Sequence, residues 1–353
     1  MGTARRQEGW LVSTARTWSY DAGDHITALA WLPDGRTLAV APAVSGITLL
    51  DRATRKAART LAGHAQANCA LSATAGLLAS AGQDGLARIW DVGSGELMRE
   101  LCTSDTESHW CEHAQFSPDG KLLATAAGRA LRVWTLDGER LLESTTHDST
   151  IAALAWRPDS AGLATGCYNG VQLFRAKGGA FEPRSYESLR WKGSIISLTW
   201  SPNGCYIAGG SQESTIQFWK LPYEPGEELF MSGYATKIRE LAWDATSRYL
   251  ASGGGEIVTV WDVSGSGPAG TIPMQLEGHT ARVSQLAFQK RGPLLASGGA
   301  DGRVFIWNLA KAQRISLELI PPCTVAALAW SPDDTALAIG AADGTVSVWE
   351  ARG

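Results

Sequence analysis

Eight stretches of this 353-residue chain repeat one pattern at a nearly constant spacing, and this self-similarity limits the possible folds more than any other feature. The best-preserved copy, 279–308, holds three short apolar runs: Val283 to Phe288, Leu294 to Ser297 and Val304 to Trp307. Alternating, β-branched and aromatic residues bounded by Gly, Pro and Asp predict strands joined by tight turns. Three such strands bury one face poorly and need neighbours, which the repetition supplies.

The last large apolar residue of each third strand marks the period. These residues are Leu50, Trp90, Trp134, Phe174, Trp219, Trp261, Trp307 and Trp349, with successive spacings of 40, 44, 40, 45, 42, 46 and 42. The repeat units therefore end near residues 51, 91, 135, 175, 220, 262, 308 and 350. A fourth, outer strand is predicted after each third strand except in the eighth unit, where the chain stops at Gly353.

The spacing, the Gly-His…Trp-Asp frame and four strands per unit resemble the WD-repeat β-propeller family over about residues 10–350. The resemblance implies an all-β fold in which residues 1–353 form a single eight-bladed propeller of four-stranded antiparallel blades. It also implies that an N-terminal strand, at about 10–18, closes the ring by pairing with the C-terminal unit, because closure removes exposed sheet edges.

Composition narrows the function classes. The net charge of −4 does not provide the basic surface that nucleic acids or anionic membranes require. No run of about 18 apolar residues could span a bilayer, and the first residues lack the apolar core of a signal peptide. Six cysteines at irregular spacings indicate reduced thiols. We therefore expect a cytoplasmic monomer that binds neither nucleic acid nor membrane.

Two units carry a His-Ser-Asp-Trp set at matching spacing. The sets are His64, Ser80, Asp84 and Trp90 in the second unit, and His279, Ser297, Asp301 and Trp307 in the seventh. A propeller hydrolase is one interpretation. The family resemblance instead implies a structural chain of hydrogen bonds inside each blade, and a catalytic triad is recognised by one accessible site rather than by repetition. We therefore expect no enzyme activity and no catalytic residue.

A metal site is a further alternative. His109, Cys111 and His113 alternate, so they share one face of an extended strand and offer ligands that suit zinc. However, Cys111 occupies a core position of the repeat, and the two-residue spacing does not match common zinc signatures. We therefore favour neither a metal nor any other cofactor.

Tryptophan placement indicates a binding surface. Only Trp110 and Trp191 lack a position in the repeat core, and both fall in loops that enter a first strand. Such loops share one side of a propeller with the turns between second and third strands. The candidate partner-binding residues there are Trp110, His147, Tyr168, Asn169, Arg190, Trp191, Lys192 and Tyr234. The alternative is that each tryptophan only covers the edge of its own blade.

Aromatic and arginine side chains on loops are typical of protein interfaces. The sequence therefore predicts a non-catalytic scaffold that binds another protein or peptide through the face of the ring. The first alternative is a propeller that binds a metal or small ligand at the ring mouth or along the His109–His113 strand, and the second is the propeller hydrolase.

Overall fold

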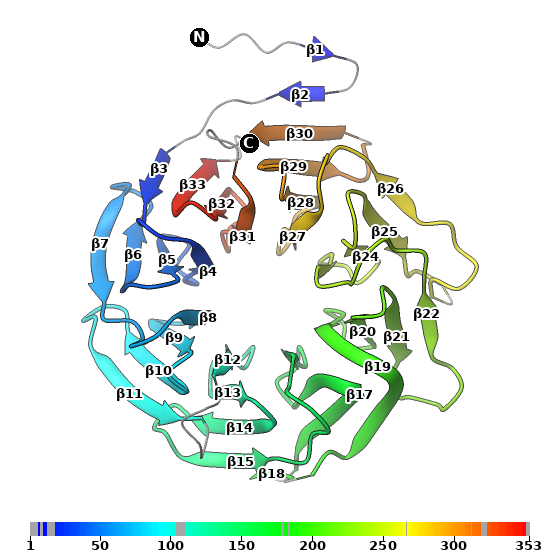
Figure 1. Cartoon of the computed structure of the whole chain (residues 1–353), viewed down its shortest axis with the longest axis horizontal. Helices are drawn as coiled ribbons and strands as arrows, with labels where there is room; N and C mark the ends of the chain where they lie inside the picture. The colour runs from blue at the N-terminus through cyan, green and yellow to red at the C-terminus, as the bar shows by residue number, and fades with distance from the viewer. Residues whose placement is uncertain are drawn as a thin grey trace.

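The computed structural model describes residues 6–7, 10–12, 18–103, 110–177, 180–182, 184–265, 267–311, 313–318 and 323–350. All regular elements within these residues are strands, which stand in a ring around a common centre (Figure 1). In the described ranges, no helix is long and apolar enough to cross a membrane. Each repeat unit runs from an inner first strand to an outer fourth strand, as the repeat pattern predicts.

Four units form separate four-stranded antiparallel sheets. Unit 1 contains β4 (Ile26–Trp31), β5 (Thr37–Pro42), β6 (Ile47–Asp51) and β7 (Lys56–Leu61). Unit 2 contains β8 (Asn68–Thr74), β9 (Leu77–Gly82), β10 (Leu86–Asp91) and β11 (Leu97–Cys102). Unit 3 contains β12 (Cys111–Phe116), β13 (Leu122–Ala127), β14 (Ala130–Thr135) and β15 (Arg140–Ser144). Unit 6 contains β23 (Leu241–Trp243), β24 (Tyr249–Ser252), β25 (Val258–Asp262) and β26 (Met274–Leu276).

Units 4 and 5 share one sheet, and this corrects the predicted blade count. The sheet is seven-stranded and contains β16 (Ala153–Trp156), β17 (Gly162–Lys177), β18 (Ala180–Phe181), β19 (Glu187–Trp200), β20 (Tyr206–Ser211), β21 (Ile216–Lys220) and β22 (Leu229–Met231). Counted as hydrogen-bonded sheets, the propeller has seven blades, and the predicted number of eight is wrong. All eight repeat units are present around the ring, but two of them lie in one sheet.

The merger follows from β19, which passes from one unit to the next without a break. Its first residues pair with β17, with Leu189 opposite Val171, and its last residues pair with β20, with Trp200 opposite Ile207. We predicted a separate outer strand and a separate first strand here. Trp191, Lys192 and Gly193 join the two across a shift of register, and pairing with β17 resumes at Ser194 opposite Tyr168, so the strand continues into the next unit.

Both ends of the chain contribute to the last two units. Unit 7 contains β27 (Val283–Phe288), β28 (Leu294–Gly299), β29 (Arg303–Asn308) and β30 (Gln313–Glu318), and its sheet is extended by β1 (Arg6–Gln7) and β2 (Trp10–Val12). Unit 8 contains β31 (Val325–Trp330), β32 (Ala336–Ala341) and β33 (Thr345–Glu350), with β3 (Trp18–Asp21) as its fourth strand. The N-terminal strand that completes the C-terminal unit is therefore β3, which begins where the expected segment 10–18 ends. Residues 10–12 of that segment instead pair in parallel with β30.

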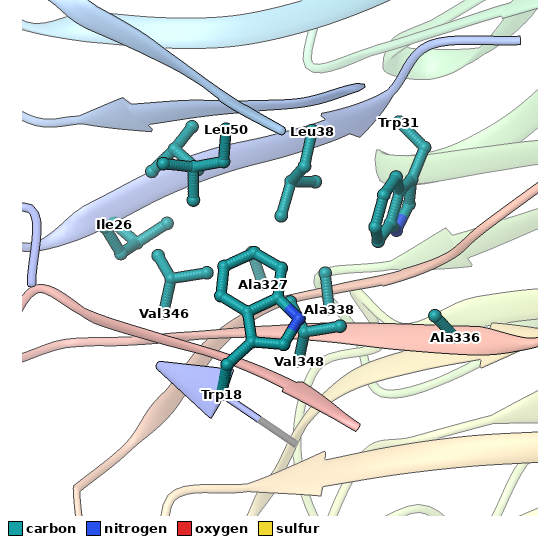
Figure 2. Packing of buried hydrophobic residues seen from close by; sticks show 11 residues of the cluster. Trp18, Ile26, Trp31, Leu38, Leu50, Ala327, Ala336, Ala338, Val346 and Val348 are labelled. Carbon is teal, nitrogen blue, oxygen red and sulfur yellow. The ribbon is translucent and has the colours of Figure 1, made fainter. Parts of the chain in front are cut away.

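A hydrophobic cluster packs unit 8 against unit 1. Trp18 and Val348, from opposite ends of the chain, pair within one sheet, and their side chains lie in the same cluster as Ile26, Leu38 and other residues of unit 1. Figure 2 shows the Trp18 ring directed toward the side chains of both units. The closing strand therefore contributes hydrogen bonds to one unit and buried apolar surface to the contact with the next.

Tryptophans that end first strands connect neighbouring units. The indole N–H of Trp31 donates to the carbonyl oxygen of Ala329 in unit 8 at 3.0 Å, and Trp330 donates in the same way to Ala287 in unit 7. Trp156 and Trp200 repeat this bond to Gln115 and Ala155 at 2.9 and 3.2 Å. The first-strand tryptophans of the repeat therefore fix each of these units to the unit before it.

Arg52 adds a polar contact across the same closing boundary. Its guanidinium donates to Glu350 and Asp333 of unit 8, with Nη1 3.1 Å from Asp333 Oδ2 and Nε 3.0 Å from Glu350 Oε1. The hydrogen bonds that Arg52 donates to Glu350 raise the pKa of Arg52 above its usual value. Bidentate arginine–carboxylate contacts are strong and geometrically specific, so this residue supports the register in which units 1 and 8 meet.

We expect that removal of residues 1–21 opens the ring. The truncated chain loses β3 and the Trp18 side chain, which exposes the edge of β33 and part of the cluster in Figure 2. Exposed strand edges favour aggregation. Thermal melting and size-exclusion chromatography should show aggregation or a strongly lowered melting temperature.

The matched control removes only residues 1–5 and keeps β1, β2 and β3. Its melting temperature should stay close to that of the full chain. A soluble chain without residues 1–21 that melts at the original temperature would contradict the closing role of β3.

Candidate functional site

One side of the ring carries the loops that lead into first strands together with the turns between second and third strands. We call this side the loop face. Neighbouring strands within a unit are antiparallel, so successive connections lie on alternate sides of the ring. The loops before first strands and the turns between second and third strands therefore lie on the same side. Trp110 lies directly before β12, Tyr168 lies in β17 where its second-strand and third-strand parts meet, and Arg190 and Lys192 lie in β19 just before its first-strand part. The loop face is therefore where the sequence places the candidate partner-binding residues.

The two His-Ser-Asp-Trp sets form chains of hydrogen bonds inside units 2 and 7. In unit 2, Trp90 Nε1 donates to Ser80 Oγ at 3.0 Å, and His64 lies 2.8 Å from both Ser80 Oγ and Asp84 Oδ1. In unit 7 the corresponding distances are 2.9 Å for Trp307 to Ser297, 2.9 Å for Ser297 to His279 and 3.1 Å for His279 to Asp301. Each series of hydrogen bonds therefore fixes the loop before the first strand to the second and third strands of the same unit.

The burial of these serines opposes a hydrolase mechanism. Ser80 and Ser297 are both fully buried, and each hydroxyl already contacts a histidine and a tryptophan. A nucleophilic serine must reach the substrate carbonyl at an accessible site. A buried network whose members are all paired instead makes its surroundings rigid.

Unit 4 contains a related set that the sequence did not reveal. His147 Nε2 lies 2.8 Å from Thr165 Oγ1, and His147 Nδ1 lies 3.0 Å from the carbonyl oxygen of Arg129. Asn169 occupies the position of the aspartate in unit 2, and its Nδ2 donates to Asp148 Oδ2 at 2.8 Å. The side chain of His147 is therefore inside the unit rather than on the surface that we predicted for it.

Unit 6 contains a set in which tyrosine replaces histidine. Trp261 Nε1 donates to the Tyr234 hydroxyl at 2.8 Å, and this hydroxyl lies 2.7 Å from Ser252 Oγ. Tyr234 was also predicted to belong to the binding surface, but its hydroxyl is directed into the unit. The spacing of Ser252 and Trp261 resembles that of the serine and tryptophan in the other sets and could have indicated this one. The set was not recognised because tyrosine stands in place of the histidine.

Five predicted residues remain accessible on the loop face. The exposed fraction is 51% for Trp110 and 48% for Tyr168, and Asn169, Arg190 and Lys192 are exposed as well. Trp191 is only partly accessible, because it packs against the core of units 4 and 5 and its ring centre lies 6.4 Å from that of Phe230. Aromatic and arginine side chains are enriched at protein interfaces, so the accessible residues are candidates for contact with a partner.

Tyr168 and Arg190 line a small recess of about 130 Å³ in unit 4. Asp148 and Gln172 contribute acceptor oxygens to its wall, and Gln172 Oε1 is buried without a hydrogen-bond partner in the described part of the chain. The recess thus offers a cationic donor at Arg190 and an unpartnered acceptor at Gln172 Oε1. Its chemistry suits a polar group carried by a partner rather than an apolar anchor alone.

The proposed metal ligands are only partly described. His109 lies outside the described residues. The Cys111 thiol is buried and directed at the carbonyl oxygen of His113, and burial raises its pKa to about 12. Burial likewise lowers the pKa of His113 to about 4. Among the residues with described positions, no group of three or more His, Cys, Asp or Glu side chains could hold a metal ion.

Comparison with known proteins identifies the repeat. The family model described as "WD domain, G-beta repeat" matches residues 55–91, 100–135, 138–171, 186–220, 227–262, 270–308 and 319–350. The groucho protein of Drosophila melanogaster is 27% identical over 247 residues, which cover 68% of this chain and 33% of groucho. The WD repeat-containing protein srw1 of Schizosaccharomyces pombe is 25% identical over 291 residues, which cover 81% of this chain and 44% of srw1. The chain thus spans less than half the length of these relatives.

A solved structure supports the same fold. The crystal structure of the computationally designed Ika8 protein superposes with a TM-score of 0.77, at 23% sequence identity, and the match covers 98% of this chain and all of Ika8. At this level of identity the likeness concerns the fold alone.

We expect Asp301→Ala to destabilise the protein by about 1–3 kcal/mol, because it leaves the buried His279 ring and the backbone N–H of Thr280 without their acceptor. Asp343→Ala is the matched control. Asp343 holds the same position in unit 8, but Ile339 replaces the serine there, and among the described residues the backbone N–H of Thr345 is the one donor to this carboxylate. Urea unfolding should show the larger loss for Asp301→Ala, and equal losses would contradict the role assigned to the set.

We also expect His147 to make folding stability depend on pH. Burial lowers its pKa to about 4, below the value of about 6.5 for an unfolded chain. Between about pH 4 and 6.5 the ring stays neutral in the folded chain but becomes protonated in the unfolded chain. The free energy of unfolding therefore falls as the pH drops from about 6.5 toward 4. In urea unfolding at pH 7.5 and 4.5, His147→Gln should lose less stability between the two pH values than the unmodified chain. The same loss in both proteins would contradict this prediction.

Proposed function

Because the chain belongs to the WD-repeat family, we propose that it is a non-catalytic scaffold that binds a partner protein or peptide through the loop face. Propellers of this family typically present their ring faces to other proteins. The observation that carries the proposal is the exposure of two large aromatic side chains from neighbouring units, Trp110 before β12 of unit 3 and Tyr168 in unit 4. Tyr168 also lines a recess together with Arg190. Aromatic and arginine residues are enriched at protein interfaces, where a few of them carry most of the binding free energy.

The arrangement of the rigid sets supports this choice of face. The chains of hydrogen bonds in units 2 and 7 hold the connections of those units in place. In unit 3, the Trp134 indole also finds a hydroxyl partner, at Thr125, but Arg129 stands where the aspartate would be. Arg129 cannot supply the carboxylate that Asp84 gives to the corresponding loop of unit 2. Residues on loops that have no such structural bond are common contributors to binding sites.

The predicted surface becomes smaller in this proposal. We retain Trp110, Tyr168, Arg190 and Lys192 as contact residues and assign Trp191 a supporting role. His147 and Tyr234 are left out because their polar atoms bond inside units 4 and 6. We further propose that the protein works in the cytoplasm, a view supported by its six free cysteines.

We expect Trp110→Ala combined with Tyr168→Ala to weaken partner binding at least tenfold, about 1.4 kcal/mol, with little change in melting temperature. Both side chains are about half exposed, so their removal leaves no buried cavity. The measurement is a titration with the partner that co-purifies from native cells, alongside thermal melting.

Tyr186→Ala is the matched control for this pair. Tyr186 is also exposed, but it precedes β19 on the opposite side of the ring, where Arg175 lies 4.7 Å from its ring centre. This variant should bind the partner normally. Equal losses from the control, or unchanged affinity in the double variant, would move the binding surface away from the loop face of units 3 and 4.

A further inference from the structure

A second and larger cavity lies at the centre of the ring, where the first strands of units 6, 7 and 8 begin. Its volume is about 450 Å³, which falls within the range of small-ligand pockets. The residues that face it belong mainly to the starts of β23, β27 and β31 and to the segments just before these strands. It therefore opens on the loop face, but in another part of the ring from Trp110 and Tyr168.

Cationic side chains dominate the wall of this cavity. Arg239 and Arg282 are both exposed and both line it, and His25 adds a further N–H group at its edge. Neither guanidinium forms a hydrogen bond or salt bridge with another residue in the described ranges of the chain. Arg239 and Arg282 thus present ten N–H donors, five on each planar fork, that are matched in geometry to carboxylate oxygens.

Two other polar side chains of the wall bond to unit 8. Ser284 Oγ donates to the carbonyl oxygen of Val325 at 2.6 Å, and Gln285 Nε2 donates to that of Ala326 at 2.7 Å. These bonds fix units 7 and 8 to each other and use the Ser284 hydroxyl and one N–H of Gln285. The two arginines are therefore the main charged donors that the cavity offers to a ligand.

Glu240 is an acidic residue buried in the same wall. Its exposed fraction is 8%, and within the described part of the chain its carboxylate accepts one long hydrogen bond from another residue, 3.4 Å from the backbone N–H of Arg239. The side chain lies over Gly253, where a Cβ atom would approach Oε2 to 2.9 Å. Burial raises the pKa of Glu240, although Arg282 opposes this effect. A buried carboxyl without a good partner, directed into a cavity, indicates a missing ligand group.

We propose that this cavity binds a carboxylate-bearing ligand, with Arg239 and Arg282 holding the carboxylate and Glu240 contacting a neighbouring polar group of the ligand. The carboxylate can belong to an acidic segment of a partner protein or to a small free dicarboxylate. The first case rests on the proposed scaffold function and specifies the chemistry of one part of the loop face. The second case is independent of that function.

The experiment uses the full chain and fluorescence anisotropy of a labelled pentapeptide with three acidic residues between two glycines. An otherwise identical peptide with amides in place of the carboxylates serves as the ligand control. The acidic peptide should bind with saturation and the amide peptide should not. Arg239→Gln combined with Arg282→Gln should weaken the binding at least tenfold, because both guanidiniums are removed from the wall.

Lys290→Gln combined with Arg291→Gln is the matched protein control. This pair removes the same charge from unit 7 at the turn between β27 and β28, on the side opposite to the loop face, and should change the affinity less than twofold. Succinate separates the two sources of carboxylate. Displacement of the peptide at a similar concentration identifies a small free acid as the ligand, whereas weak displacement identifies the peptide.

The proposal is overturned if neither the peptide nor succinate binds. It is also overturned if the amide peptide binds equally well, or if the two double variants lose affinity to the same extent. The scaffold proposal is tested separately, because Trp110 and Tyr168 do not line this cavity and their variants are judged with the native partner. Thermal melting of each double variant ensures that a loss of binding is compared between folded proteins.

Discussion

The structure depends on one non-covalent closure. Trp18–Asp21 must pair with β33 before unit 8 has its fourth strand, and only then do units 1 and 8 share a core. The Trp31 indole and the Arg52 guanidinium cross the same boundary. Residues almost 300 positions apart therefore have to meet before the ring exists, and every other boundary between units is formed by neighbours in the chain. Long-range pairing of this kind is entropically costly, which explains why several kinds of interaction gather there.

Periodicity in the sequence was enough to predict the order of the repeat strands and the inner and outer position of each. It did not predict β1, β2 or β18, nor the number of sheets. Whether two units separate depends on the few residues between an outer strand and the next first strand, and at Trp191, Lys192 and Gly193 the strand continues through a shift of register. The family model and the superposed structure identify the repeat and the fold. The number of sheets follows from the hydrogen-bond pattern of this chain, in which β19 joins units 4 and 5.

The candidate site was predicted in part. Trp110 and Tyr168 are exposed, as expected for residues that have no position in the repeat core. For Trp110, this exposure could be inferred from the positions of the other tryptophans. The inward direction of His147 and Tyr234 could not be inferred, because Thr165 stands in place of a serine and Tyr234 in place of a histidine. The ring mouth was predicted as an alternative ligand site, but the residues of the central cavity were not identified. Arg239 and Arg282 come from successive units, and they line one cavity because successive first strands converge on the centre of the ring.

The closing pair also determines how the protein responds to mechanical load. Trp18 lies opposite Val348 and Asp21 opposite Thr345, so the chain leaves β3 toward the N-terminus and β33 toward the C-terminus at the same end of the pair. Tension between these two points acts on one hydrogen bond at a time instead of loading all of them together. The ring would unzip at low force along this pair, while strands pulled lengthwise in shear would resist. Fusion of a cargo to both ends at once would therefore strain the weakest mechanical direction of the fold.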